Sequence, residues 1–209
     1  MKTYMREPSP RVVAVEHLTL DGVYQAPARV DEDTRNGFTH GGWAMAGDDP
    51  EMQRTIGRYM VDGWSLLVGR TTYEDLYEGW RVRQPSSPMT HALTAVQKFV
   101  VSQGSAYELG WENSTLLSGD GVDNVAKLKN QHEKPLITFG SGVLVRSLLK
   151  EAVLDELVLM IHPLVLGTGY RMFEGSPPAK LGLAHQFVTA TGVIIATYRG
   201  SPSAQTGLS

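Results

Sequence analysis

Two glycine-containing turns carry residue types that bind phosphate, and the first is VGRTTY at residues 68–73. It follows a short apolar segment and precedes a helical pattern. Gly69 allows a tight turn beside a ligand, and the first turn of the following helix offers free N–H groups to an anion. Arg70 adds a planar fork of donors, and Thr71 and Thr72 add hydroxyl donors. The alternative is that Thr71 caps a helix and that Arg70 is a solvated surface residue.

The second turn is FGSGVL at residues 139–144, which again joins an apolar segment to a helical pattern. A lone Gly-x-Gly is weak evidence for a nucleotide site, and Ser141 could be an ordinary helix N-cap. The two turns together are more informative, because both follow expected buried strands and both suit phosphate. A ligand with phosphates in two places fits this pair. NADPH, with a pyrophosphate and a separate ribose phosphate, is such a ligand.

Apolar segments bounded by glycine, proline and asparagine predict the strands that must position these turns. A long segment rich in glycine, proline and asparagine, 23–47, is expected to be a functional loop, and 81–89 is a second loop rich in proline and serine. Helices are expected from Pro50 onward and over 71–79, 122–132 and 143–150, and strands over 11–20, 64–68, 98–102, 114–117, 136–139, 154–162, 181–189 and 193–198.

Strands alternate with helices through the middle of the chain, and the chain ends with consecutive strands. This order predicts an α/β fold, with a mostly parallel twisted sheet, helices on both of its faces and an antiparallel C-terminal edge. Ligands bind such sheets beyond the carboxyl ends of the strands, which is where both turns lie. We expect one domain over residues 11–199, with flexible termini at 1–10 and 200–209.

The composition of the 209 residues excludes several classes of function. A net charge of −3 gives no electrostatic case for binding nucleic acid. The absence of cysteine excludes disulfides, thiolate metal sites and a cysteine nucleophile, and the histidines show no metal-ligand spacing. No apolar segment reaches the roughly 18 residues of a membrane span, and no signal-peptide pattern opens the chain, so we expect a cytoplasmic protein without a membrane partner.

Six segments, in this order, resemble the dihydrofolate-reductase-like superfamily, in particular stand-alone proteins related to the C-terminal reductase domain of bacterial riboflavin biosynthesis. The last segment is the most specific, because its Asp155-Glu156 pair, His162-Pro163 and Gly167-x-Gly169 would not recur together by chance. The resemblance implies a single-domain dihydrofolate-reductase-like fold. The segments are LTLDGVYQAP (18–27), HGGW (40–43), LLVGRTTYEDL (66–76), KFVVSQ (98–103), LITFGSGVLVRSLL (136–149) and LDELVLMIHPLVLGTGYRMF (154–173).

The same resemblance implies NADPH as cofactor and gives its contacts residue by residue. The first turn matches the one that holds the adenosine ribose phosphate, which favours NADPH over NADH, and the second matches the pyrophosphate turn. Asp21 and Trp43 are expected to line the substrate pocket. The implied cofactor-binding residues are Gly69, Arg70, Thr71, Thr72, Ser102, Gly140, Ser141, Gly142, Val143 and Leu144.

The proton source is less clearly marked. Hydride transfer to a C=N bond needs an acid, and folate-reducing relatives use one carboxylate near the start of the helix after the first loop. Here that region offers Asp48, Asp49 and Glu51, which could equally be helix-start charges. Asp21 is the other candidate, and its alternative is a plain Asp-Gly turn. We take Asp21, Asp49 and Glu51 as the candidate catalytic acids.

The chain departs from both branches of the superfamily. Thr138 stands where reductases of the riboflavin pathway usually carry a substrate-contacting glutamate, and GRTTYEDL is closer to the folate-reductase form. Folate reductases themselves lack the ending LVLGTGYRMF. The hypothesis is therefore an NADPH-dependent reductase, similar to dihydrofolate reductase or to 5-amino-6-(5-phosphoribosylamino)uracil reductase, that acts on a small planar heterocycle (a pterin, a pyrimidine or a similar C=N group). The alternatives are a non-catalytic nucleotide-binding module and a structural domain without nucleotide.

The late strands raise the question of partners. Relatives of the riboflavin type pair as homodimers through these strands, so the resemblance implies a homodimer with residues 157–166 at its interface. The alternative is that these apolar residues are only core. His162 ends the same apolar segment and could donate a proton, although a structural histidine is the more usual case.

Overall fold

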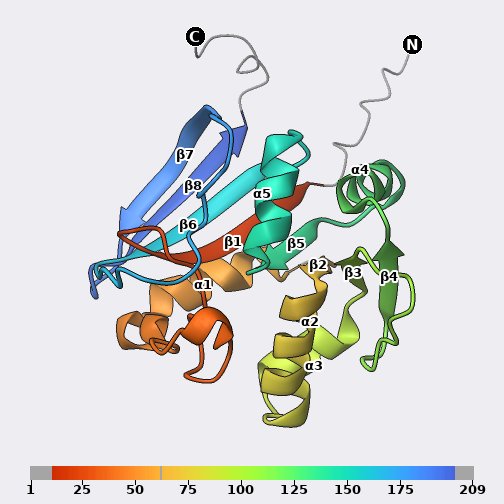
Figure 1. Ribbon diagram of the computed structural model, residues 1–209, viewed down its shortest axis with the longest axis horizontal. Coiled ribbons are helices and arrows are strands. Elements are labelled where there is room, and N and C mark those ends of the chain that lie inside the picture. The colour runs from red at the N-terminus through yellow and green to blue at the C-terminus, as the bar shows by residue number, and fades with distance from the viewer. Residues whose placement is uncertain (1–10, 62, 201–209) are drawn as a thin grey trace.

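The computed structural model describes residues 11–61 and 63–200, and it forms one eight-stranded sheet in the order β4-β3-β2-β5-β1-β6-β8-β7 (Figure 1). The expected flexible termini lie outside the described residues, apart from Gly200. Every neighbouring pair from β4 to β6 is parallel, and β8 runs antiparallel to both β6 and β7. The strands are β1 (Val12–Thr19), β2 (Ser65–Gly69), β3 (Lys98–Ser102), β4 (Ser114–Ser118), β5 (Leu136–Phe139), β6 (Glu156–His162), β7 (Leu181–Val188) and β8 (Ile194–Gly200).

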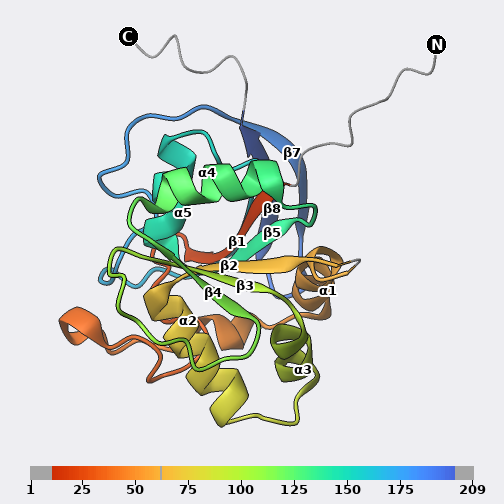
Figure 2. The ribbon, with the colours of Figure 1, turned by 90° about the vertical axis from the view of Figure 1, so that its right-hand side faces the viewer.

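Helices cover both faces of this sheet, with α4 and α5 on one face and α1, α2 and α3 on the other (Figures 1 and 2). A π-helical turn, Tyr77–Val82, continues α2. The predicted α/β fold with an antiparallel edge is confirmed. The helices are α1 (Pro50–Tyr59), α2 (Arg70–Leu76), α3 (Pro88–Ala95), α4 (Gly121–Gln131) and α5 (Gly142–Lys150).

The side chains of β1 alternate between two buried faces of the sheet, which explains why its sequence is continuously apolar. Val13 and Val15 join the core cluster that also holds Met52 of α1, whereas Val12 and Ala14 join the cluster on the α4 and α5 side. Successive side chains point to opposite faces of a strand, and both faces of this central strand are covered. A charged side chain in such a strand is buried whichever face it takes.

The apolar residues of β6 belong to the core and not to a free surface. Leu157, Val158, Leu159 and Met160 are all buried against the chain's own sheet and helices. Parallel pairing with β1 and antiparallel pairing with β8 leave β6 in the interior of the sheet, so these side chains are core, and the homodimer interface expected over 157–166 stays a prediction. Within the described residues, no helix is long and apolar enough to cross a membrane.

The long loop after β1 is ordered by contacts with the segment that follows β6. The backbone N–H of Tyr24 donates to the carbonyl oxygen of Tyr170, and that of Met172 donates to the carbonyl oxygen of Gly22. Two short 3-10 helices, Arg35–Gly37 and Trp43–Gly47, lie within the loop. The loop thereby closes over the carboxyl ends of the central strands, which is where the site lies.

Candidate functional site

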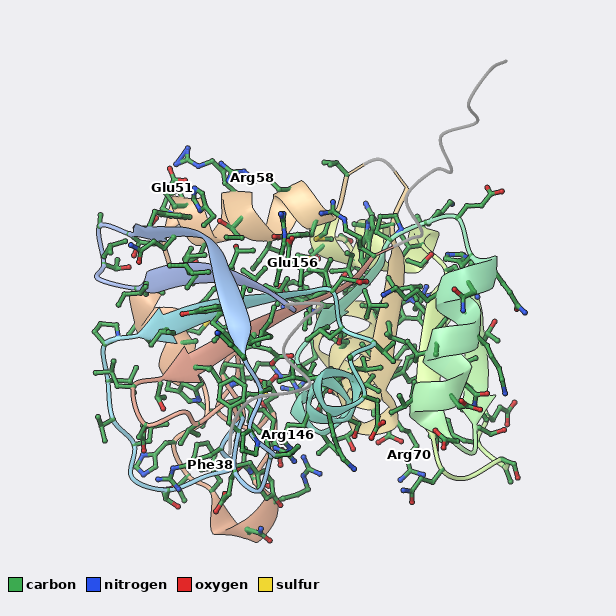
Figure 3. The ribbon with its side chains drawn as sticks, turned by 90° about the horizontal axis from the view of Figure 1, so that it is seen from above. Phe38, Glu51, Arg58, Arg70, Arg146 and Glu156 are labelled. Atoms are coloured by element: carbon green, nitrogen blue, oxygen red, sulfur yellow. The ribbon has the colours of Figure 1, made fainter. Side chains whose placement is uncertain are left out.

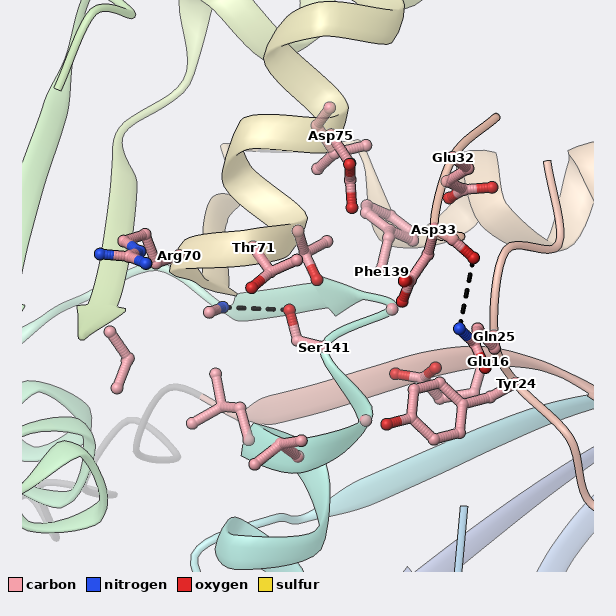
Figure 4. A pocket seen from close by; sticks show the side chains of 18 of the residues that line it. Glu16, Tyr24, Gln25, Glu32, Asp33, Arg70, Thr71, Asp75, Phe139 and Ser141 are labelled. Atoms are coloured by element: carbon pink, nitrogen blue, oxygen red, sulfur yellow. Dashed lines mark hydrogen bonds between the residues drawn. The ribbon is translucent and has the colours of Figure 1, made fainter. Parts of the chain in front are cut away.

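One large cavity lies beyond the carboxyl ends of β3, β2, β5 and β1, and its volume is about 980 Å³. Ligand pockets span roughly 300–1,000 Å³, so the cavity has room for a cofactor and a substrate together. Its wall also includes residues from the loop after β1 and from α2 and α5 (Figure 4). All ten residues expected to hold the cofactor line this cavity, namely Gly69, Arg70, Thr71, Thr72, Ser102, Gly140, Ser141, Gly142, Val143 and Leu144.

The two glycine turns form one continuous surface. The backbone N–H of Gly69 donates to the side-chain oxygen of Ser141 at 3.0 Å, which ties the end of β2 to the start of α5 (Figure 4). Ser141 therefore does not act as an ordinary N-cap, since its side chain accepts no bond from its own helix. Thr71 is no cap either, because α2 already begins at Arg70.

The backbone of the second turn has the conformations that glycine favours. Gly140 has φ of +72° and Ser141 has φ of +68°. A Cβ on Gly142 would lie 2.6 Å from the ring of Tyr24, so only glycine fits where this ring rests on the start of α5. Gly142, Val143 and Leu144, the first residues of α5, line the cavity, and the free N–H groups of a helix's first turn suit an anion.

Arg70 lies at the outer rim, with 53% of its side chain exposed. Its guanidinium is 3.6 Å from the Glu74 carboxylate and 5.4 Å from the centre of the Tyr107 ring. Contacts of this kind at the surface are weak, so a ribose phosphate can compete for the guanidinium.

Asp21 does not line the cavity. Its carboxylate accepts the Thr19 hydroxyl at 2.6 Å and the backbone N–H groups of Leu166 and Gly167, and it lies 3.3 Å from the Arg171 guanidinium. The Thr19 hydroxyl, followed by these backbone donors, lowers the pKa of Asp21 to about 2. Asp21 is thus an ionised group that fastens the segment after β6 to the end of β1, and it is poorly suited to donate a proton.

Asp49, Glu51 and Trp43 also lie outside the cavity lining. Asp49 caps α1 by accepting the backbone N–H of Glu51 at 2.8 Å, and Glu51 pairs with Arg54 at 2.9 Å. Figure 3 shows Glu51 at the opposite corner of the molecule from Arg70. Trp43 is buried, and its indole N–H donates to the carbonyl oxygen of Gln25. The geometry gives these three residues structural roles.

Other carboxyl groups line the cavity, and the residue patterns had not marked them. Asp75 lies on the inner side of α2, opposite Glu32 and Asp33 of the loop after β1 (Figure 4). Burial, followed by the charge of Glu32, raises the pKa of Asp75 to about 7. Burial also raises the pKa of Glu32. Asp33 is held by the Arg35 guanidinium. Asp75 is therefore the acid whose ionisation falls near neutral pH.

Glu16 is a further buried acid on the floor of the cavity. It is 2% exposed, and its Oε1 atom has no hydrogen-bond partner. Burial raises the pKa of Glu16 well above its usual range. A signal was present in the sequence, since Glu16 is the one carboxylate within the apolar segment 11–20.

His17, which follows Glu16 on β1, contacts His162 at the end of β6. His17 Nδ1 lies 2.9 Å from His162 Nε2, and only His17 lines the cavity. Burial and the neighbouring His162 lower the pKa of His17 to about 4, and burial lowers the pKa of His162. Both rings are neutral at pH 7, so His162 has the structural role that was the alternative to proton donation.

The fold and these turns can be compared with known proteins. The family model of the RibD C-terminal domain matches residues 10–195. The chain belongs to the RibD C-terminal domain family. Among curated proteins it is 25% identical over 195 residues to the uncharacterized protein YyaP of Bacillus subtilis (strain 168), covering 90% of this chain and 94% of that protein.

Solved structures of similar fold extend the comparison. A putative riboflavin biosynthesis protein from Shewanella sp. PV-4 superposes with a TM-score of 0.67 at 21% identity, covering 92% of this chain and 99% of the other. Dihydrofolate reductase from Enterococcus faecalis, complexed with NADP(H) and RAB-propyl, superposes with a TM-score of 0.60 at 13% identity, covering 92% and 98%. At these identities the likeness shows the fold alone.

The residues of this RibD C-terminal domain fit a phosphorylated dinucleotide. Two phosphate-suited turns line one cavity, and their glycines let a ligand approach the backbone N–H groups closely. In the same cavity, Glu16 Oε1 has no hydrogen-bond partner within the protein. Within residues 11–61 and 63–200, no group of three or more histidine and carboxylate side chains could hold a metal ion.

Proposed function

We propose that this protein is an NADPH-dependent reductase that transfers a hydride to a small planar heterocycle containing a C=N bond. The observation that carries the proposal is that both phosphate-suited turns line one cavity whose other half is walled by apolar side chains and acids. A cofactor along the turns would place its reactive end against that second half. Membership of the RibD C-terminal domain family supports reductase chemistry.

The first turn would hold the ribose phosphate of the cofactor. Arg70 offers the only guanidinium among the residues of the two turns, and Thr71 and Thr72 add hydroxyl donors beside it. A phosphate monoester matches this set of donors, which supports NADPH over NADH. When bound, the cofactor supplies the hydride.

The second half of the cavity would hold the substrate. Apolar side chains from α1, the π-helical turn and α3 face it, including Ile56, Trp80 and Leu93. The carboxyl groups of Glu32 and Asp75 line the same half of the cavity. A flat heterocycle would pack against the apolar wall and turn its ring N–H groups toward the carboxyl groups.

Asp75 is the residue we propose as the proton donor, in place of Asp21, Asp49 and Glu51. A general acid works best when its pKa lies near the working pH, and the pKa of Asp75 is raised to about 7. In its protonated form Asp75 would give its proton to the substrate nitrogen while the adjacent carbon takes up the hydride. The product amine and oxidised cofactor balance the reaction.

A turnover assay with a panel of substrates tests the proposal. The purified protein is mixed with NADPH and with dihydropterins, oxidised pterins or aminopyrimidines, and loss of reduced nicotinamide is followed. We expect oxidation of NADPH that depends on one of these substrates and that the Asp75→Asn variant strongly reduces. Binding of NADPH without turnover of any panel member would instead favour a non-catalytic nucleotide-binding module.

A further inference from the structure

The order of strands in the sheet gives the path that a dinucleotide would follow across the cavity. Ser102 ends β3, the ribose-phosphate turn follows β2, and the pyrophosphate turn follows β5. The next strand in the sheet is β1. A cofactor extended over these strands therefore reaches β1 with its nicotinamide half, and the residue of β1 at this position becomes a cofactor contact.

Glu16 occupies this position on β1. The backbone N–H of Gly140 approaches the carbonyl oxygen of Val15, so Glu16 is the first residue of β1 beyond the end of β5. Figure 4 shows its carboxyl next to the Tyr24 ring. Its Oε1 atom is buried without a partner although it borders a cavity of about 980 Å³. A native protein rarely keeps such an atom unpaired unless a ligand satisfies it.

No charged group compensates an ionised Glu16. In the β-sheet register its partner on β6 is Leu159, and the end of β5 beside it is Gly140. The ionisable groups on the elements packed against it are the Tyr24 phenol, from the loop after β1, and Arg146 of α5, whose guanidinium carbon is 5.9 Å from the centre of the Tyr24 ring. Arg35 of the same loop also acts on this phenol. His17, next to it in sequence, is neutral and points to the other face of the sheet. Burial raises the pKa of Glu16 and thus favours the protonated form of its carboxyl.

We propose that Glu16 is a cofactor-binding residue that acts as an uncharged acid, hydrogen-bonding the sugar hydroxyls or the carboxamide of the nicotinamide half. This inference rests on the proposed function, because it needs a nicotinamide cofactor in the cavity. A protonated carboxyl can both donate and accept, which matches a hydroxyl or an amide. A carboxylate at the same place would repel the neighbouring pyrophosphate across a buried, poorly screened space. Cofactor binding is therefore linked to the protonation of Glu16.

A binding titration across pH tests this proposal without measuring turnover. The dissociation constants of NADPH and NADH are determined by fluorescence and calorimetry from about pH 5 to about pH 9. NADH is included because it lacks the ribose phosphate, whose own ionisation adds a pH dependence. For the wild type we expect the dissociation constant to rise with pH, by up to tenfold per pH unit once Glu16 ionises.

Two substitutions then separate the charge of Glu16 from its hydrogen bond. The variant E16Q keeps polar atoms and cannot ionise, so the rise with pH should disappear while binding at low pH stays close to wild type. The variant E16M should also lose the rise, and its binding at low pH should weaken by roughly tenfold because the hydrogen bond is gone. If one variant fails to fold, the other still decides the question.

The matched control is Glu156→Gln on the neighbouring strand β6. Glu156 is 4% exposed, but it pairs with Arg199 at 3.0 Å and lies outside the cavity lining. This variant should keep the pH dependence of wild type. If E16Q binds with the same pH dependence as wild type, the role of Glu16 is overturned and the proposed function stands. If wild type binds neither cofactor at any pH, both proposals fall.

Discussion

Asp21, Asp75 and Glu16 differ in what surrounds their carboxyl groups, and this difference assigns their roles. Asp21 receives hydrogen bonds from Thr19, Leu166 and Gly167 and is fixed as an anion. Asp75 is half-buried beside Glu32 and titrates near neutral pH. Glu16 is fully buried and unpaired. Environment, and not residue type, therefore separates a structural carboxylate from an acid that can hold a proton.

The role of Asp75 predicts a pH profile. The protonated form is the donor, so activity should be highest below about pH 7 and should fall as pH rises through the pKa of Asp75. Asp75→Asn should reduce kcat by roughly 100-fold or more, with a smaller change in cofactor affinity. Steady-state kinetics across pH measures both effects. An unchanged kcat in this variant would mean that the proton comes from another group or from water.

The burial of Glu16 predicts a gain in stability when it is replaced. Because its pKa is raised, Glu16 holds a proton in the folded state that it loses above about pH 4.3 in the unfolded state. Glu16 therefore lowers the free energy of unfolding increasingly as pH rises. Glu16→Met should raise the free energy of unfolding by roughly 1–3 kcal/mol at alkaline pH and by less at acid pH. Urea denaturation at two pH values measures this. A loss of stability in E16M at both values would contradict the account.

At the scale of elements, α5 and the loop after β1 meet where Tyr24 rests on Gly142. Gly142→Ala would bring a Cβ within 2.6 Å of the Tyr24 ring. We expect a loss of roughly 1–3 kcal/mol in the free energy of unfolding and weaker cofactor binding, because the ring must move into the cavity. In a Tyr24→Ala background, Gly142→Ala should lower the free energy of unfolding much less, because the ring is no longer there.

Gly57 in α1 provides the control for this prediction. A Cβ there would meet nothing within 4 Å. Gly57→Ala should therefore be neutral or slightly stabilising, since alanine favours a helix more than glycine does. Thermal unfolding of the variants compares the two positions. Equal effects at Gly57 and Gly142 would argue against a tight contact between Tyr24 and α5.

The sequence predicts those elements whose signals are local. The turns at Gly69 and Gly140 were predictable because each lies between an apolar strand and a helix, which is a pattern of adjacent residues. The helix α3 was not predicted: its first two residues fall in the expected loop 81–89 and the rest had no assignment, although Ser87 caps it by accepting the Thr90 N–H and Pro88 takes its first position. Loop composition outweighed the cap signal there.

The acids could not be assigned in the same way, because their roles depend on distant parts of the chain. The partners of Asp21 at Leu166 and Gly167 lie 145 and 146 residues away in sequence. Asp75 comes two residues after the first turn, within the segment LLVGRTTYEDL, but only the packing of α2 shows that it lines the cavity. Glu16 alone had a local signal, a carboxylate inside an apolar strand.

At the scale of the whole molecule, the hairpin of β7 and β8 forms one edge of the sheet (Figure 1). Some of its apolar side chains are exposed. Leu183 is 54% exposed and Val188 is 63% exposed. An uncovered edge strand with such side chains is prone to pair with another chain. We expect a homodimer that forms through this hairpin, in place of the buried strand β6.

Light scattering after size-exclusion chromatography tests the dimer. Wild type should have twice the chain mass, and Leu183→Lys together with Val188→Lys should shift it to the monomer. Val143→Lys changes an equally exposed apolar residue on α5 and serves as the control for solubility. A monomeric wild type at concentrations well above those of the assay would exclude this interface.

The central claim is that the two joined turns bind NADPH and recognise its ribose phosphate. The most direct measurement is an equilibrium titration of wild type and of the double variant Arg70→Ala, Thr72→Ala with NADPH and NADH. We predict that wild type prefers NADPH and that the double variant loses roughly 10- to 100-fold in NADPH affinity, about 1.4–2.8 kcal/mol in total, with little change for NADH. Equal affinities of wild type for the two cofactors, or an unchanged preference in the double variant, would contradict the account.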